Sequence, residues 1–433
     1  FDSKTESCRL IPVLHFLSNM SSVMVCGGGN AGQVATCLFS AQSKVTALSL
    51  SSGERWAQAV QEAGSMSCMF EGTDKVVQSV PDLITADPSA VKHCNIVFMT
   101  VPSPYHEQYL TALEPHVREG TVFAVMPGGS GCDFLFKKVM GEKVEKLGLV
   151  VFDALPWACR VKEFGKTSTM LGIKDITGVA VMLAKGMLKS QVLSELQGLL
   201  GQKPAILDAP NIMSISLANP GQVIHPGVMY GRWHNWDGQP LTEKPLFYQG
   251  VDDFTATVLE GMSSEILEIC KALNSLPHKD ENDQARYVKS LMGWYMSSYS
   301  SQIADTSNLC RAMNTNAAYE GLCHPVKDAD GGYIPDFQHR YLSEDVPTGL
   351  CFSRGVAELL GLKTPVIDKV LYWCQDQLKR EFLTISGKMA GTDIKMSRAP
   401  QAYGVTKRAQ LYEFLGIIST KPQTAIFANV GGC

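Results

Sequence analysis

The chain has 433 residues and a mass of 47.1 kDa, a length that predicts two domains and leaves room for a third. Hydrophobic residues make up 45% and charged residues 18%, a balance that favours large buried cores and argues against disorder. The net charge of −4, without a long basic run, argues against a nucleic-acid partner.

Cysteine content and apolar runs bear on the compartment. The 13 cysteines include no CxxC pair, which argues against a disulfide scaffold or a zinc module and favours a reducing, cytoplasmic location. No apolar stretch reaches the roughly 18 residues that a membrane helix needs, so we expect no membrane partner. Residues 10–17 are apolar like a signal-peptide core, but Asp2 and Glu6 precede them and no clear cleavage site follows. We therefore expect residues 1–19 to be an N-terminal extension outside the fold.

A glycine-rich segment follows the first apolar run of the remaining chain. Residues 23–26 predict a short strand and residues 33–41 predict a helix; between them lie Gly27, Gly28, Gly29, Asn30, Ala31 and Gly32. The glycines at 27, 29 and 32 match G-x-G-x-x-G, whose members permit a tight turn, backbone approach to a pyrophosphate and close helix–strand packing. The segment is either an ordinary glycine-rich turn or a dinucleotide-binding loop, and its position between strand and helix favours the second.

The rest of the first half alternates strands and helices. We expect strands at residues 44–50, 95–101, 121–126 and 147–152, with helices near 104–117 and 132–140. The continuous apolar strands are typical of a parallel sheet that is buried on both faces. We therefore predict an α/β fold, with a Rossmann-type, doubly wound sheet over residues 20–206. Because ligands bind beyond the carboxyl ends of such strands, Val101 and Pro102 should lie near the cofactor.

The end of the second predicted strand bears on the choice of cofactor. Ser51 and Ser52 lie where an acidic residue for the ribose hydroxyls is expected, and Glu54 comes late. No arginine stands at the strand end to bind a 2′-phosphate, since Arg55 lies a few residues further on. This pattern favours NAD(H).

The second half reads differently. The alternation fades after about residue 205, and residues 253–275, 283–299 and 366–382 predict helices, so residues 207–433 should form a helical second domain. His225 precedes a proline, and the proline disfavours regular helix at the histidine. The His225 side chain is either a proton shuttle or a structural histidine. Arg340 and Asp345 lie close together in sequence, where Arg340 could clamp a carboxylate and Asp345 could orient a histidine, or both could form surface salt bridges.

Residues 153–160 predict a substrate-facing turn after a strand. Cys159 in that turn is either a pocket residue or a small buried hydrophobe. No HExxH motif, cysteine pair or carboxylate cluster indicates a metal site.

Five segments together resemble one family. The glycine loop, LPWACR at 155–160, HPGVMYGRW at 225–233, HPVK at 324–327 and RYLSEDVP at 340–347 occur in an order that resembles the opine dehydrogenases of marine invertebrates: octopine, tauropine, alanopine and strombine dehydrogenases. The resemblance covers the chain from about Val23. It implies a Rossmann-type domain followed by an all-helical opine dehydrogenase domain. It also implies NADH-dependent reductive condensation of pyruvate with an amino acid or taurine, which regenerates NAD in anaerobic glycolysis.

The resemblance also implies roles for single residues. His225 matches the family's catalytic histidine, Asp345 its carboxylate partner, Arg340 the arginine that binds a substrate carboxylate, and Cys159 a residue of the substrate pocket. The chain differs from the octopine enzymes in having Gly129 where we expect Gln and Ala154 where we expect Thr, and residues 216–222 also look different. These changes fall on the substrate side and favour an amine smaller than arginine.

Two other classes stay open. One is another two-domain NAD-dependent dehydrogenase of the glycerol-3-phosphate or 6-phosphogluconate type, which would need a catalytic lysine such as Lys327. The other is an NAD-binding sensor without catalysis. In each case we expect small-molecule ligands and a monomer or small homo-oligomer.

Overall fold

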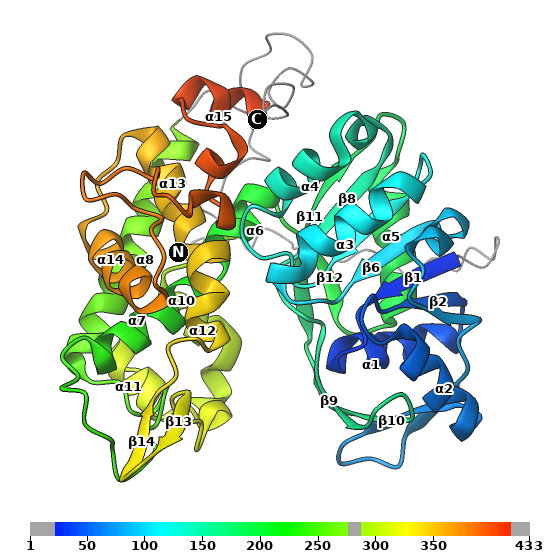
Figure 1. Cartoon of the computed structure of the whole chain (residues 1–433), viewed down its shortest axis with the longest axis horizontal. Helices are drawn as coiled ribbons and strands as arrows, with labels where there is room; N and C mark the ends of the chain where they lie inside the picture. Colours follow the sequence, from blue (N-terminus) through cyan, green and yellow to red (C-terminus); the bar gives the residue numbers. More distant parts are fainter. Residues whose placement is uncertain (1–21, 276–286, 417–433) are drawn as a thin grey trace, which may run out of the picture. The chain divides into compact units, whose positions relative to one another are not determined.

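The computed structural model describes residues 22–275 and 287–416, which form two compact units (Figure 1). One unit contains the chain up to Gly128 and Leu135–Ile215; the other contains Gly129–Phe134 and the chain from Ser216 onward. The N-terminal extension predicted at residues 1–19 lies outside the described residues. No helix in the described part of the chain is both long and apolar enough to cross a membrane.

An eight-stranded sheet forms the centre of the first unit, in the order β12-β11-β8-β7-β6-β1-β2-β5. From β5 to β8 all neighbours are parallel, β11 pairs antiparallel with β8, and β12 pairs parallel with β11. The strands are β1 (Ser22–Cys26), β2 (Lys44–Leu48), β5 (Leu83–Thr85), β6 (Ile96–Met99), β7 (Val122–Val125), β8 (Gly148–Phe152), β11 (Ile176–Leu183) and β12 (Ala205–Asp208). The predicted Rossmann-type sheet is therefore confirmed.

Helices lie between these strands along the chain, as the alternating pattern predicted. They are α1 (Asn30–Ser40), α2 (Gly53–Ala63), α3 (His106–Leu113), α4 (Cys132–Met140) and α5 (Lys189–Leu200). β6, β7 and β8 are buried along their whole lengths, which explains why their sequences are continuous apolar runs rather than alternating ones. β1 lies between β2 and β6, so the strand order reverses at the carboxyl end of β1, where α/β sheets of this kind bind their ligands.

A second sheet in this unit did not follow from the sequence. It has the order β4-β3-β10-β9, formed by β3 (Met66–Phe70), β4 (Val76–Ser79), β9 (Trp157–Glu163) and β10 (Thr167–Ile173). The turn predicted for residues 153–160 is wrong from Trp157 onward, because β9 pairs antiparallel with β10. Trp157 and Cys159 alternate with exposed neighbours and pack into the hydrophobic core, so tertiary pairing decides the conformation there.

The second unit is helical, as predicted, and carries one short hairpin. Its helices are α7 (Gly221–Trp233), α8 (Asp253–Asn274), α10 (Leu291–Tyr299), α11 (Leu309–Asn314), α12 (Arg340–Ser343), α13 (Cys351–Leu360), α14 (Pro365–Leu378) and α15 (Arg408–Phe414), with a π-helical turn, η8 (Val346–Leu350), before α13. The hairpin pairs β13 (Val326–Ala329) with β14 (Gly332–Pro335). Part of the helix predicted at 283–299 falls outside the described residues. A further helix, α6 (Ile212–Ala218), spans the boundary of the two units.

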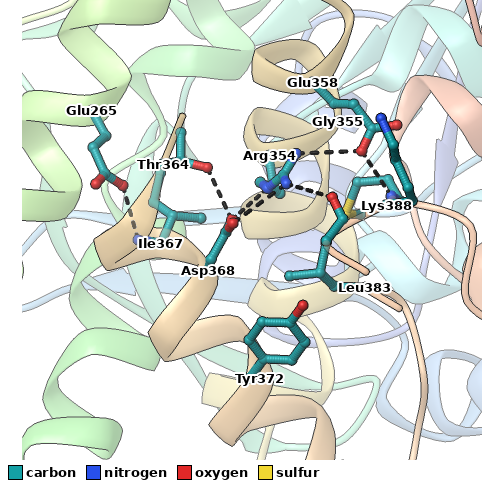
Figure 2. Close-up of polar contacts among 12 residues, drawn as sticks. Glu265, Arg354, Gly355, Glu358, Thr364, Ile367, Asp368, Tyr372, Leu383 and Lys388 are labelled. Atoms are coloured by element: carbon teal, nitrogen blue, oxygen red, sulfur yellow. Dashed lines mark hydrogen bonds and ion pairs between the residues drawn. The ribbon is translucent and has the colours of Figure 1, made fainter. Parts of the chain in front are cut away.

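A nearly buried arginine links three segments of the second unit (Figure 2). The Arg354 guanidinium on α13 donates to Asp368 on α14, forms an ion pair with Glu358, and donates to the Gly387 carbonyl at 2.9 Å. The Glu265 side chain on α8 accepts from the Ile367 amide at 2.9 Å, in the first turn of α14. Because buried charges need partners, this network fixes the packing of α8, α13 and α14 on one another.

Candidate active site

The imidazole of His225 is held by a carboxylate 120 positions away in the chain. His225 Nδ1 lies 2.8 Å from Asp345 Oδ2, and the two side chains are 21% and 17% exposed. α7 supplies the histidine, and Asp345 is the residue before the π-helical turn η8. The sequence could not show that these residues touch, and the folded chain brings them into hydrogen-bond contact.

The prediction that His225 interrupts regular helix is wrong. His225 and Pro226 both lie inside α7, where Pro226 lacks the N–H that would bond to the Gln222 carbonyl. Tertiary packing outweighs this local cost, because α7 is buried along most of its length. Gly227 and Gly231 face α8: a Cβ on Gly227 would lie 2.6 Å from Leu259 Cδ2, and one on Gly231 would lie 2.2 Å from Thr255 Oγ1. Close packing of two helices therefore keeps α7 continuous.

Aromatic side chains complete the surroundings of His225, and the sequence analysis missed them. Tyr248 OH lies 3.2 Å from His225 Nε2. The Tyr341 ring stacks on the imidazole, with centroids 4.0 Å apart and planes 14° apart. Phe247 lies further out, 6.0 Å from the imidazole centroid. Tyr248 belongs to a segment without a recognisable motif, so nothing in the sequence indicated that it would contact His225. For Tyr341, the sequence offered one indication, namely its place directly after Arg340.

Arg340 begins α12 and is largely solvent-exposed. Its Nη2 lies 2.8 Å from Glu344 Oε2, and its side chain is 61% exposed while Glu344 is buried. An ion pair one helical turn apart is a common surface arrangement. A guanidinium carries five N–H donors, so the pair with Glu344 leaves donors that can bind a second carboxylate.

The second His-Pro pair is structural. His324 is buried, and its Nδ1 accepts the Trp233 Nε1–H at 3.1 Å, so this nitrogen carries no proton. Burial lowers the pKa of His324 to about 3, and the nearby Arg232 adds to the effect. His324 is therefore neutral at physiological pH. Lys327 is 55% exposed and forms an ion pair with Asp336 at 2.8 Å, which is unlike the desolvated site of a catalytic lysine.

The glycine loop in the first unit combines close packing at one glycine with open backbone at another. A Cβ on Gly32 would lie 1.7 Å from the Gly27 carbonyl oxygen, so only glycine allows α1 to pack this closely on the end of β1. Gly29, the residue before α1, is exposed and has open space where a Cβ would stand. Asn30 starts α1, and its side chain accepts the Val161 amide at 2.8 Å. The first amides of α1 are thus presented at an open backbone surface.

The other residues of the predicted cofactor site lie around this loop. Ala31 is buried in the first turn of α1, and Gly28 faces the Ser49 and Ser52 hydroxyls, which would lie 3.2 and 3.1 Å from a Cβ on it. Val101, after β6, is buried, and its Cγ1 would lie 2.9 Å from a Cβ on Gly27. Pro102 is exposed. The residues proposed for the cofactor therefore meet at the carboxyl ends of β1 and β6.

The remaining predicted substrate residues fall in different places. Cys159 is buried on β9 in the hydrophobic core, and burial raises the pKa of its thiol to about 11, a setting that favours the packing alternative. Ala154 is half-buried in the loop between β8 and β9. Gly129 has φ +65° and belongs to the helical unit, where the neighbouring Ser130 donates to the Ser216 carbonyl at 2.7 Å.

Comparison with known proteins identifies the family. Residues 208–378 match the family described as NAD/NADP octopine/nopaline dehydrogenase, alpha-helical domain. The opine dehydrogenase of Haliotis discus hannai is 37% identical over 397 residues, which cover 89% of this chain and 96% of that protein. The chain belongs to the opine dehydrogenase family. The tauropine dehydrogenase of Arabella iricolor is also 37% identical, over 393 residues covering 89% of this chain and 98% of that protein.

Solved structures of an octopine dehydrogenase agree with this family assignment. Its complex with NADH and L-arginine matches with a TM-score of 0.86 at 34% identity, covering 93% of this chain and 100% of that one. Its complex with NADH and pyruvate matches with a TM-score of 0.82 at 33% identity over the same shares. The matched part of the chain includes both the Rossmann-type unit and the helical unit of the opine dehydrogenase fold.

Proposed function

We propose that the protein catalyses the NADH-dependent reductive condensation of pyruvate with an amino acid or taurine. The observation that carries the proposal is the hydrogen bond of 2.8 Å between His225 Nδ1 and Asp345 Oδ2, in the unit that matches the family's helical domain. The family relatives support pyruvate, an amine and NADH as reactants, since they include a tauropine dehydrogenase and an octopine dehydrogenase solved with NADH and pyruvate.

NADH fits the glycine loop of the first unit. Only glycine fits at Gly32, and the backbone at Gly29 is open, so the loop and the first amides of α1 would hold the pyrophosphate. Val101 and Pro102 would border the same site. When bound, NADH would supply the hydride that reduces the imine carbon.

His225 would handle the protons of the condensation. The amine nitrogen adds to the keto carbon of pyruvate, the carbonyl oxygen takes up protons and leaves as water, and an imine remains for reduction to the secondary amine. Because the Asp345 carboxylate accepts Nδ1–H, Nε2 is the ring atom that exchanges protons with the reactants: it takes up a proton that the adding amine loses and, as imidazolium, gives a proton to the carbonyl oxygen. Asp345 also stabilises the imidazolium form of His225, as the carboxylate does in other His–Asp pairs.

Arg340 would bind the pyruvate carboxylate. It lies one residue before Tyr341, whose ring stacks on His225, so its backbone is close to the imidazole. The exposed guanidinium retains donors beside its pair with Glu344. Gly129 and Ala154 remain the residues that favour an amine smaller than arginine, whereas the burial of Cys159 in the hydrophobic core favours a packing role over a place in the pocket.

The test is NADH oxidation, followed by absorbance, with pyruvate and a panel of taurine, alanine, glycine, β-alanine and arginine. We expect turnover only when pyruvate and an amine are both present, and a secondary amine in the mass spectrum of the product. Turnover with pyruvate alone would overturn the proposal. NADH binding without turnover for any pair would favour the sensor alternative.

A substitution tests the assignment of His225. We expect His225→Gln to lower kcat by roughly 10²- to 10⁴-fold while NADH binding stays unchanged, because general acid–base catalysis contributes about that factor. His116→Gln, on an exposed residue of the first unit, is the matched control and should leave turnover at the level of the unsubstituted enzyme. Equal turnover of the two variants would remove His225 from the mechanism.

A further inference from the structure

The ring atom of His225 that exchanges protons already has a partner within the protein. Tyr248 OH lies 3.2 Å from Nε2, on the opposite edge of the imidazole from Asp345. A histidine held at one nitrogen can still pivot about that bond. Contacts at both nitrogens and on one ring face, by Tyr341, define the plane of the ring and the direction in which Nε2 points.

The donors and acceptors in this chain of contacts follow from the chemistry of each group. An ionised carboxylate only accepts, so Nδ1 carries the proton toward Asp345, and Nε2 of the neutral ring is an acceptor. Burial raises the pKa of Tyr248 well above its usual range, and the neighbouring Tyr341 and Tyr295 raise it further. The phenol therefore keeps its proton and donates it to Nε2.

Packing fixes the position of the Tyr248 hydroxyl. The Tyr248 ring is buried and stacks on Tyr319, with centroids 3.9 Å and planes 12° apart, and Phe247 lies edge-on at 4.8 Å. Tyr319 in turn donates to the Tyr299 hydroxyl at 2.9 Å. The hydroxyl therefore reaches His225 from a rigid aromatic cluster rather than from a mobile side chain.

We propose that Tyr248 is a positioning residue for His225, whose hydroxyl binds Nε2 in the substrate-free enzyme, fixes the imidazole orientation and gives way to the substrate oxygen. This inference rests on the proposed function, which assigns proton transfer to His225 Nε2. It predicts that Tyr248 contributes mainly to kcat, because an imidazole without this contact can pivot about its bond to Asp345, so that fewer substrate complexes have Nε2 in the productive direction. The glycine loop proposed for NADH lies in the first unit, whereas Tyr248 belongs to the second.

The charges around His225 set the sign of the expected pH effect. Asp345, Tyr248 and Tyr341 contact the imidazole, and His339 interacts with it electrostatically. Of these, Asp345 favours the imidazolium, and a second histidine, His339, opposes it. The Tyr248 O–H donates to the neutral ring and so favours the neutral form. Removing this hydroxyl should move protonation of His225 to higher pH.

The test is Tyr248→Phe, which removes the hydroxyl and keeps the stacked ring. We expect kcat to fall roughly 10-fold, KM for NADH to stay unchanged, and the His225-dependent limb of the pH profile to move up by about half a unit to one unit. NMR of labelled histidines should show the same shift in the titration midpoint of the signal that is missing in His225→Gln. Tyr319→Phe is the matched control: it removes a hydroxyl from the same aromatic cluster that has no contact with His225, so the midpoint should not move.

The two readouts separate failure of this inference from failure of the proposed function. A midpoint in Tyr248→Phe that stays in place or moves to lower pH overturns the role of Tyr248, whatever the turnover. A midpoint that moves up, with no turnover by the unsubstituted protein for any pyruvate–amine pair, overturns the proposed function and keeps the hydrogen bond from Tyr248 to His225.

Discussion

Adding a single methyl group at Gly221 should lower the activity of the protein while its fold stays intact. Gly221 is the first residue of α7, and a Cβ added there would lie 2.9 Å from Asp345 Oδ1 and 3.2 Å from Asn219 Oδ1. The nearest atom is the end of a side chain rather than backbone. We therefore expect Gly221→Ala to displace the Asp345 carboxylate from His225 without disturbing α7 itself.

The expected magnitude follows from the contact that is lost. A hydrogen bond to a charged group contributes about 1.5–3 kcal/mol, so its loss should lower kcat roughly 10- to 150-fold. The group that must move is the end of a side chain, so the added methyl group opposes no backbone atom of α7. The free energy of unfolding should thus stay within about 1 kcal/mol of the unsubstituted value.

The assay combines NADH oxidation with urea unfolding. Gly198→Ala is the matched control, since Gly198 lies within α5 and has open space around its Cβ position. That substitution should stabilise the protein slightly and leave turnover unchanged. Unchanged kcat in Gly221→Ala, alongside a large loss in Asp345→Asn, would refute the steric reasoning, because it would show that the carboxylate keeps its contact despite the added methyl group.

Three further outcomes follow from the burial or exposure of single side chains in the helical unit. Arg354→Met should lower the free energy of unfolding, measured in urea, by about 3 kcal/mol, because it leaves Asp368 and Glu358 without their shared cation. NADH binding should stay unchanged, and an unchanged unfolding midpoint would contradict the prediction. Because burial lowers the pKa of His324 to about 3, the unfolded chain takes up this proton first as pH falls below about 6.5. Stability should therefore decrease toward acid pH by up to ~1.4 kcal/mol per unit, and His324→Gln should flatten that slope in urea unfolding at several pH values. Cys323 is the exposed cysteine among those described, while burial raises the pKa of Cys37 to about 11. Cys323→Ala should thus remove one rapidly reacting thiol equivalent from the native protein, and an unchanged count would show that a buried thiol reacts instead.

Features whose residues are adjacent in the chain could be predicted from the sequence. The glycine loop is one of these, because the strand, the three glycines and the helix that form it are contiguous, and Gly27 and Gly32 each meet a local steric demand. The buried parallel strands were equally clear, since burial on both faces requires continuous apolar runs. The order of five short segments was enough for the family resemblance.

Features that depend on distant partners needed the folded chain. β9 was mistaken for a turn because its conformation comes from pairing with β10, and α7 was expected to break at His225 because its stability comes from packing on α8. The contact between His225 and Asp345 joins residues 120 positions apart, and Tyr248 reaches the same imidazole from a segment without a motif. Residue types and spacing restrict local conformation and chemistry, whereas the direction in which a side chain points is set by packing between helices.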